Sequence, residues 1–135
     1  MKVIILAAGC GTRLLPYTKT IPKCMVKLAN KPLLHHQIEV LHQAGLHDII
    51  VVGGYRAEKI SGKGIQMVLN HKFDKTNMVS TLFCAEKYMT EGEDLIITYG
   101  DIIYELKVLN ALIKSEASIA VSIDKNWRNL WRIRM

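Results

Sequence analysis

The stretch VIILAAGCGTR, residues 3–13, joins an apolar run to a glycine-rich turn. Val3–Leu6 has the short, β-branched composition of a buried parallel strand, and Ala-Ala-Gly ends it. Gly9 and Gly11 let backbone N–H groups approach phosphate oxygens, and Arg13 adds a fork of donors suited to phosphate. The stretch therefore predicts a strand that leads into a phosphate-binding loop, although a tight glycine turn beside a surface arginine fits the spacing equally well.

The rest of the chain alternates between predicted strands and helices. Strands are expected at residues 48–54, 65–70, 94–101 and 117–124, and helices at 33–44, 79–89 and 106–115. Asn30 is expected to cap the first helix, Pro32 to lie in its first turn and Gly45 to end it. The alternation predicts an α/β fold with a Rossmann-like, parallel or mostly parallel sheet and crossover helices, as one nucleotide-binding domain over residues 1–135.

Each candidate motif follows the carboxyl end of a predicted strand. These motifs are Ala8–Arg13, Gly53–Tyr55, Asn77–Ser80 and Tyr99–Asp101. Ligands of open α/β sheets bind at the carboxyl ends of the strands, so we expect the four motifs to form one site. The dinucleotide fingerprint is excluded, because Leu14 occupies the position of its third glycine. The P-loop is excluded, because the chain has no Gly-Lys-Ser/Thr sequence.

Four polar residues near these strand ends have both a functional and a structural interpretation. Lys23 is suited to neutralise charge on a phosphoryl group, although a lysine is more often simply solvated. Asp101 ends an apolar strand and is a poor helix cap, so we interpret it as a Mg²⁺ ligand. Asn77 and Ser80 offer hydrogen bonds to a base edge, while capping of the following helix is the safer interpretation.

Composition limits the class of partner and the compartment. A formal charge of +6, from 18 Lys and Arg against 12 Asp and Glu, suits an anionic ligand. The basic residues are scattered, and no apolar stretch is long enough to span a bilayer, so we expect no nucleic-acid or membrane partner. Cys10, Cys24 and Cys84 show no zinc-site spacing and are expected to be reduced thiols of a cytoplasmic protein.

Together the motifs resemble the sugar-nucleotide and phosphocholine nucleotidyltransferase family. The family signature Leu-Ala-Ala-Gly-x-Gly-Thr/Ser-Arg-Leu agrees with residues 6–14, and a Pro-Lys pair follows at 22–23. The stretches VVGGYRAEKI (51–60), NMVSTL (77–82) and ITYGDIIYE (97–105) resemble the branch that makes cytidine diphosphate compounds. The resemblance implies a cytidylyltransferase that uses CTP, Mg²⁺ and a small phosphate or phosphonate acceptor and releases pyrophosphate.

The resemblance also implies roles for individual residues. Arg13 and Lys23 would be catalytic, with Lys23 on the α-phosphate, and Asp101 would bind Mg²⁺. The nucleotide would be bound by Leu6, Ala7, Ala8, Gly9, Gly11, Thr12, Gly54, Tyr55, Asn77, Ser80 and Gly100.

The family's catalytic domain is longer than this chain and completes its metal site with a second aspartate downstream of Asp101. We therefore expect residues 1–135 to be the N-terminal part of a truncated nucleotidyltransferase fold. Two alternatives stay open, a hexose-1-phosphate thymidylyl- or uridylyltransferase and a non-catalytic nucleotide-binding fragment. Asn77-Met-Val-Ser80, in place of a Gln-x-x-x-Gly motif, favours the cytidine branch over the first alternative.

Trp127 and Trp131 lie four residues apart and would share one face of a helix. Core packing is their most ordinary role, and an aromatic wall for a cationic group is the alternative. Exposure of these rings, or of Ile119 and Val121 on the strand predicted at 117–124, would favour association with another chain. We therefore expect a homodimer whose contacts involve Trp127 or Trp131.

Overall fold

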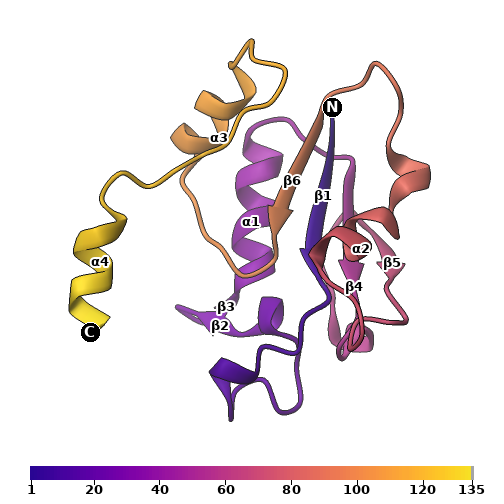
Figure 1. Ribbon diagram of the computed structural model, residues 1–135, viewed down its shortest axis with the longest axis vertical. Helices are drawn as coiled ribbons and strands as arrows, with labels where there is room; N and C mark the ends of the chain where they lie inside the picture. The colour runs from indigo at the N-terminus through magenta and orange to yellow at the C-terminus, as the bar shows by residue number, and fades with distance from the viewer. Residues whose placement is uncertain (135) are drawn as a thin grey trace.

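The computed structural model describes residues 1–134 and is built around a four-stranded parallel sheet (Figure 1). Its strands are β1 (Lys2–Ala7), β4 (Ile49–Gly53), β5 (Ile65–Leu69) and β6 (Leu95–Tyr99), in the spatial order β5-β4-β1-β6. In the central strand, Val3 lies opposite Ile49 on one side, and Lys2 lies opposite Leu95 on the other. These four strands and their parallel pairing confirm the predicted α/β fold.

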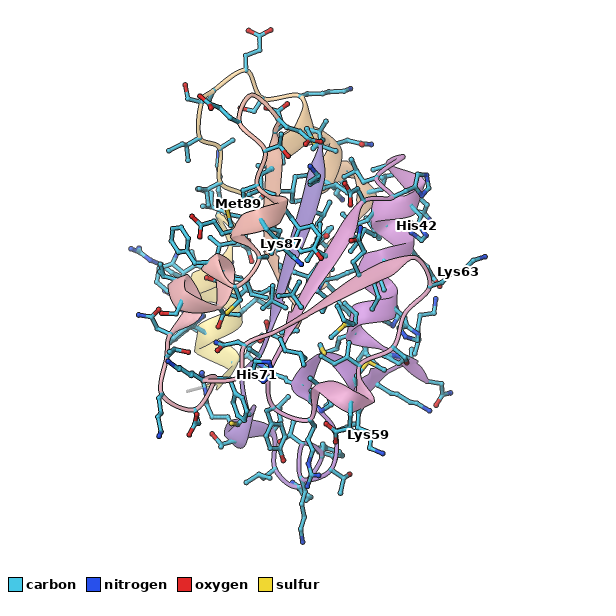
Figure 2. The ribbon with its side chains drawn as sticks, turned by 90° about the vertical axis from the view of Figure 1, so that its right-hand side faces the viewer. His42, Lys59, Lys63, His71, Lys87 and Met89 are labelled. Carbon is cyan, nitrogen blue, oxygen red and sulfur yellow. The ribbon has the colours of Figure 1, made fainter. Side chains whose placement is uncertain are left out.

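Helices cover both faces of the sheet, which explains the uninterrupted apolar sequence of its central strands. α1 (Leu33–Gln43) and α3 (Leu106–Ile113) form a core with one face, and α2 (Met78–Phe83) packs on the other. In Figure 2 the two layers lie on opposite sides of the strands, with His42 of α1 on one side and Met89, beyond α2, on the other.

Short elements connect these layers. They are the 3-10 turns η1 (Thr12–Leu14), η2 (Lys23–Met25), η3 (Ala57–Lys59) and η4 (Glu86–Tyr88), and the antiparallel strands β2 (Lys27–Leu28) and β3 (Lys31–Pro32). The helix predicted at 79–89 is therefore wrong in its extent, because α2 ends at Phe83 and η4 follows. At this junction the N–H of Ala85 bonds to the carbonyl of Leu82, which is 3-10 rather than α-helical spacing.

The start of α1 also differs from the prediction. Asn30 lies in the β2–β3 turn at φ 65°, a left-handed conformation that asparagine tolerates better than most residues, and it caps no helix. Pro32 ends β3 and directly precedes the helix. Gly45 ends α1 as predicted, with a left-handed φ of 78°. The N–H of Leu46, the next residue, donates back to the carbonyl of Leu41 in the last turn of the helix.

The strand predicted at 117–124 is wrong. Within residues 1–134 this segment pairs with no other strand, and Ile119 is 86% exposed, so its backbone lacks the ladder partners that a strand requires. α4 (Trp127–Arg134) forms as the tryptophan spacing predicts and lies away from the sheet (Figure 1). Trp127 and Trp131 contact each other edge to face and are about half exposed, so their predicted core packing is wrong. Self-association through them stays a prediction.

No helix of the described region is long and apolar enough to cross a membrane.

Candidate functional site

A cavity of about 390 Å³ opens at the carboxyl ends of β1 and β6. This volume suits a small-molecule ligand, and the position is where α/β sheets bind ligands. Most of the residues predicted for the site line it: Leu6, Ala7, Ala8, Gly9, Gly11, Thr12, Arg13, Lys23, Asn77, Gly100 and Asp101. The predicted convergence of the strand-end motifs is therefore confirmed for the first, third and fourth motifs.

Gly9 and Gly11, in the loop after β1, are needed for different reasons, one for the cavity and one for the fold. A Cβ placed on Gly9 would meet no atom within 4 Å, so the missing side chain leaves open space beside the cavity. Gly11 has φ 62°, and a Cβ there would lie 3.0 Å from Cβ of Lys23 and 3.1 Å from Cγ2 of Thr18. Gly11 is thus required by the fold itself, because only glycine combines this backbone conformation with so close an approach.

Hydrogen bonds from Thr18 and Tyr55 hold the glycine loop, residues 8–13, in place. The hydroxyl of Thr18, a residue that is 1% exposed, donates to the carbonyl of Gly11 at 2.9 Å. The N–H of Tyr55 donates to the carbonyl of Ala8 at 3.0 Å. A Cβ on Gly54 would lie 2.8 Å from that same carbonyl oxygen. Gly54 and Tyr55 therefore support the loop and lie outside the lining of the cavity.

Lys23 and Asp101 bring opposite charges to the rim of the cavity. The Nζ of Lys23, in η2, forms an ion pair with Oδ2 of Asp101, and each side chain is 34% exposed. The turn that carries Asp101 is tightly placed, because Gly100 donates its N–H to the carbonyl of Leu6 at 2.9 Å and a Cβ on it would lie 3.0 Å from Cβ of Cys24. A partly exposed pair contributes little to stability, so both groups can exchange partners when a ligand enters.

Arg13 lies in η1 and lines the cavity beside the glycine loop. Among the residues that the structure describes, no carboxylate forms an ion pair with it. Its guanidinium can therefore donate its N–H groups to an anion in the cavity.

Asn77 begins the wall formed by α2. Its Oδ1 accepts the N–H of Ser80 at 3.1 Å, which confirms the capping interpretation, and the residue also lines the cavity. Ser80 is exposed and lies outside the lining. A contact of either side chain with a base stays a prediction.

Several lining residues were not predicted: Leu14, Cys24, Phe73, Thr76 and Thr81. Met78 and Tyr99, which lie within the predicted motifs Asn77–Ser80 and Tyr99–Asp101, also line the cavity. The hydroxyl of Tyr99 lies 2.9 Å from Sδ of Met78, which joins the β6 wall to the α2 wall. Phe73 could not be predicted, because it lies in a loop that carries no sequence motif. Burial raises the pKa of the Cys24 thiol to about 12, so this cysteine is a neutral wall residue and not a nucleophile.

The donor set limits what metal the site could hold. Over residues 1–134, no three His, Cys, Asp or Glu side chains gather as a metal site. Mg²⁺ keeps several waters and is commonly bound by one or two carboxylates together with substrate phosphates. Asp101 alone therefore fits a Mg²⁺ ion that arrives with a nucleotide, and it does not fit a metal bound by protein side chains alone.

The comparisons with known proteins agree with this geometry. The family model described as MobA-like NTP transferase domain matches residues 3–130. A Campylobacter jejuni protein named CTP:phosphoglutamine cytidylyltransferase is 43% identical over 99% of this chain and 56% of its own length. A choline-phosphate cytidylyltransferase of Streptococcus pneumoniae is 38% identical over 68% of this chain and 42% of its own length.

A solved structure gives the same result for the fold. The CTP:phosphocholine cytidylyltransferase from Streptococcus pneumoniae superposes with a TM-score of 0.67 at 36% identity, over 74% of this chain and 44% of that one. The chain thus spans about half the length of the relatives it matches. The resemblance drawn from the sequence motifs is confirmed at the level of the family.

Proposed function

The chain belongs to the MobA-like NTP transferase family, and from this premise we propose that it serves to transfer CMP from CTP to a small phosphorylated acceptor. The observation that carries the proposal is the cavity at the end of β1, where the glycine loop, Arg13 and the Lys23–Asp101 pair meet. The relatives named above are cytidylyltransferases, which favours CTP over other nucleotides.

The cationic side chains are placed to bind a triphosphate. Arg13 has no carboxylate partner among the described residues and offers its guanidinium to the ground-state triphosphate. Lys23 is paired with Asp101, and a phosphate that entered the rim would compete for its ammonium group. Gly9 leaves space for backbone N–H groups to approach the phosphate oxygens.

The proposed reaction needs no nucleophilic side chain. An acceptor phosphate oxygen, ionised near neutral pH, bonds to the α-phosphorus of CTP. The bond from that phosphorus to the bridging oxygen breaks, and pyrophosphate leaves with the electron pair. Arg13 and Lys23 offset the repulsion between acceptor and triphosphate and the charge on the leaving group. Mg²⁺, held by Asp101, would supply further charge compensation when bound.

The neutral thiol of Cys24 agrees with direct transfer. Its pKa of about 12 leaves almost no thiolate near pH 7, so the cysteine beside the cavity would form no covalent intermediate. The acceptor is proposed only as a class, a small phosphate or phosphonate such as phosphocholine or aminoethylphosphonate.

A nucleotide panel tests the proposal. CTP, UTP, dTTP and ATP are each titrated with Mg²⁺, and the thermal midpoint and dissociation constant are measured. We expect CTP to bind most tightly, and equal binding of all four nucleotides would overturn the cytidine assignment. Arg13→Ala serves as the site control and Arg56→Ala, at the exposed residue that precedes η3, as the surface control.

A pyrophosphate-release assay then separates transfer from binding. CTP and Mg²⁺ are supplied with phosphocholine or aminoethylphosphonate, and UTP or dTTP and Mg²⁺ are supplied with glucose 1-phosphate. Release with one of the first two acceptors supports cytidylyl transfer. Release only with glucose 1-phosphate supports the hexose-1-phosphate alternative, and tight CTP binding without release from any acceptor supports a nucleotide-binding role alone.

A further inference from the structure

Two amide side chains, Gln37 and Asn70, are buried directly behind the walls of the cavity. They are 1% and 4% exposed, and neither lines the cavity. Burial of an amide is unfavourable unless its groups are hydrogen-bonded, and both amides are bonded on the nitrogen and the oxygen side. What these amides bond to points to their role.

Gln37 spans the turn that carries Asp101. It lies on the buried face of α1, and its Nε2 donates to the carbonyls of Tyr99 at 2.7 Å and Ile102 at 2.8 Å. These carbonyls immediately flank Gly100 and Asp101 in the chain. The amide oxygen accepts the hydroxyl of Thr98 at 3.4 Å. One side chain therefore fixes both ends of the turn that presents the carboxylate to Lys23.

Asn70 does the same for the wall that contains Asn77. It follows β5, and its Nδ2 donates to the hydroxyls of Thr76 and Thr81, each at 3.0 Å. Both threonines line the cavity. Their own hydroxyl protons are donated elsewhere, that of Thr76 to the carbonyl of Lys72 at 2.8 Å and that of Thr81 to the carbonyl of Asn77 at 3.1 Å. The direction of each bond is therefore fixed, and the chain from 72 to 81 is held as one unit.

An amide is suited to this role because its NH₂ group has two donors in one plane. It can link two acceptors that belong to separate parts of a loop, which a hydroxyl or an apolar side chain cannot do. The two amides bond to different walls. Gln37 bonds around the β6 end, and Asn70 bonds to Lys72, Thr76 and Thr81 in the loop before α2 and in α2 itself. Loss of one should disturb its own wall most, and the other wall only through the contact between Tyr99 and Met78.

We propose that Gln37 and Asn70 are positioning residues for two separate parts of the nucleotide. Gln37 supports the wall that meets the triphosphate, because that wall carries Asp101 in its ion pair with Lys23. Asn70 supports the wall that meets the nucleobase, because the residues that line it, among them Phe73, Thr76 and Met78, carry no charge. This inference rests on the proposed function, because it divides the same site into two halves. Neither residue touches the ligand, so both act through the backbone turns that they hold.

The test compares CTP with inorganic tripolyphosphate, which has the phosphates and lacks the base. Calorimetry with Mg²⁺ gives both dissociation constants for the full chain and for Gln37→Met and Asn70→Ala. Asn70→Ala is expected to weaken CTP about fivefold and to change tripolyphosphate by less than about twofold, the effect of losing oriented hydrogen bonds on one wall. Gln37→Met is expected to weaken both ligands by the same factor, again about fivefold.

Ile50→Val, in the middle of the sheet, is the control for general loss of stability. It should lower the melting temperature and leave both dissociation constants unchanged, because Ile50 lies in the core away from the cavity lining. Milder variants keep the test available if the first ones do not fold. Asn70→Ser retains one donor, and Thr98→Val removes the hydroxyl that bonds to Gln37, so each should give a smaller change in the same direction.

The outcomes separate the inference from the proposed function. If wild-type protein binds CTP but both variants weaken both ligands equally, or change neither, the amides only stabilise the fold and the inference is wrong. If wild-type protein binds neither CTP nor tripolyphosphate, the proposed function fails and the inference fails with it.

Discussion

Lys23 and Asp101 lie 78 positions apart in the chain and form an ion pair at the rim of the cavity. The sequence motifs assign these residues to separate partners, a phosphate for the lysine and a metal ion for the aspartate. In the ligand-free protein each neutralises the other, which keeps both charges compensated until a ligand arrives. Entry of a triphosphate with its cation would then give each residue its own partner.

Replacing Lys23 should separate chemistry from binding. Lys23→Ala is expected to lower the rate of pyrophosphate release about a hundredfold, because its charge matters most while the α-phosphate rearranges. CTP affinity should fall less than about fivefold, since Arg13 still contacts the ground-state triphosphate. Turnover and binding are measured on the same preparation, with Lys27→Ala, at an exposed position of β2, as control. Equal losses of turnover and affinity would contradict this division of roles.

Replacing Asp101 should remove the effect of the metal on binding. In the wild-type protein Mg²⁺ is expected to strengthen CTP binding, and in Asp101→Asn this gain should disappear. Without Mg²⁺, Asp101→Asn should bind CTP at least as tightly as wild type, because Lys23 is no longer paired. The dissociation constant is measured with Mg²⁺ and again with EDTA, with Glu58→Gln on the exposed η3 turn as control. A variant that keeps the full Mg²⁺ gain would exclude Asp101 as the metal ligand.

Arg13 is expected to bind phosphate in the ground state. Arg13→Ala should weaken CTP and inorganic tripolyphosphate by the same factor, about tenfold, since a charge-assisted contact is lost from the part that both ligands share. Arg13→Lys should recover part of this loss, because it restores charge without the planar fork. Calorimetry on both ligands checks the result. An effect on CTP alone would place Arg13 at the base or ribose instead.

The glycine loop should show a clean separation of stability and binding. Gly9→Ala is expected to change the free energy of unfolding by less than about 0.5 kcal/mol, because no atom lies within 4 Å of the new Cβ, yet to weaken CTP by filling space at the cavity. Gly11→Ala should destabilise by about 1–2 kcal/mol from its left-handed backbone alone and by more from contact with Lys23.

Gly92→Ala is the matched control for Gly11→Ala. Gly92 also has a left-handed backbone, at φ 77°, but a Cβ there would meet no atom within 4 Å. Urea unfolding of the three variants and CTP titration of Gly9→Ala complete the test. If Gly11→Ala and Gly92→Ala lower the free energy of unfolding by the same amount, the close approach of Gly11 to Lys23 does not contribute to stability.

The sheet and most of the cavity were predictable from local sequence. Two apolar runs that lead into glycine, Val3–Leu6 and Ile49–Gly53, indicate buried parallel strands. The carboxyl ends of such strands lie at the same edge of the sheet, as the pairing of β1 with β4 confirms. Residues of the glycine loop, Lys23 and Asp101 follow such ends directly, and the structure brings them together in one cavity. Here local pattern and tertiary arrangement agree.

The remaining parts depend on contacts that local sequence does not encode. Residues 117–124 alternate like a strand, but strand formation requires a neighbouring strand, and the described region supplies none. Gln37 is a polar residue on an otherwise apolar face of α1, and the helical pattern gives no reason for its burial. The reason is its hydrogen bonds to the β6 end, which only the structure shows. Gly54 and Tyr55 follow a strand end as the lining residues do, yet they face the back of the loop.

The thiol of Cys24 gives a test of the buried wall that needs no ligand. Burial raises its pKa to about 12, so at pH 8 its thiolate fraction is about a thousandfold below that of an ordinary thiol. Iodoacetamide at pH 8 should therefore modify Cys24 far more slowly than Cys10 and Cys84, which are partly exposed. The rate at Cys24 should keep rising with pH towards 12, because only the thiolate reacts. Peptide mass spectrometry in buffer and in urea measures the three sites separately. Modification of native Cys24 as fast as in urea would mean that η2 opens readily and that the wall beside Lys23 is not the buried one seen here.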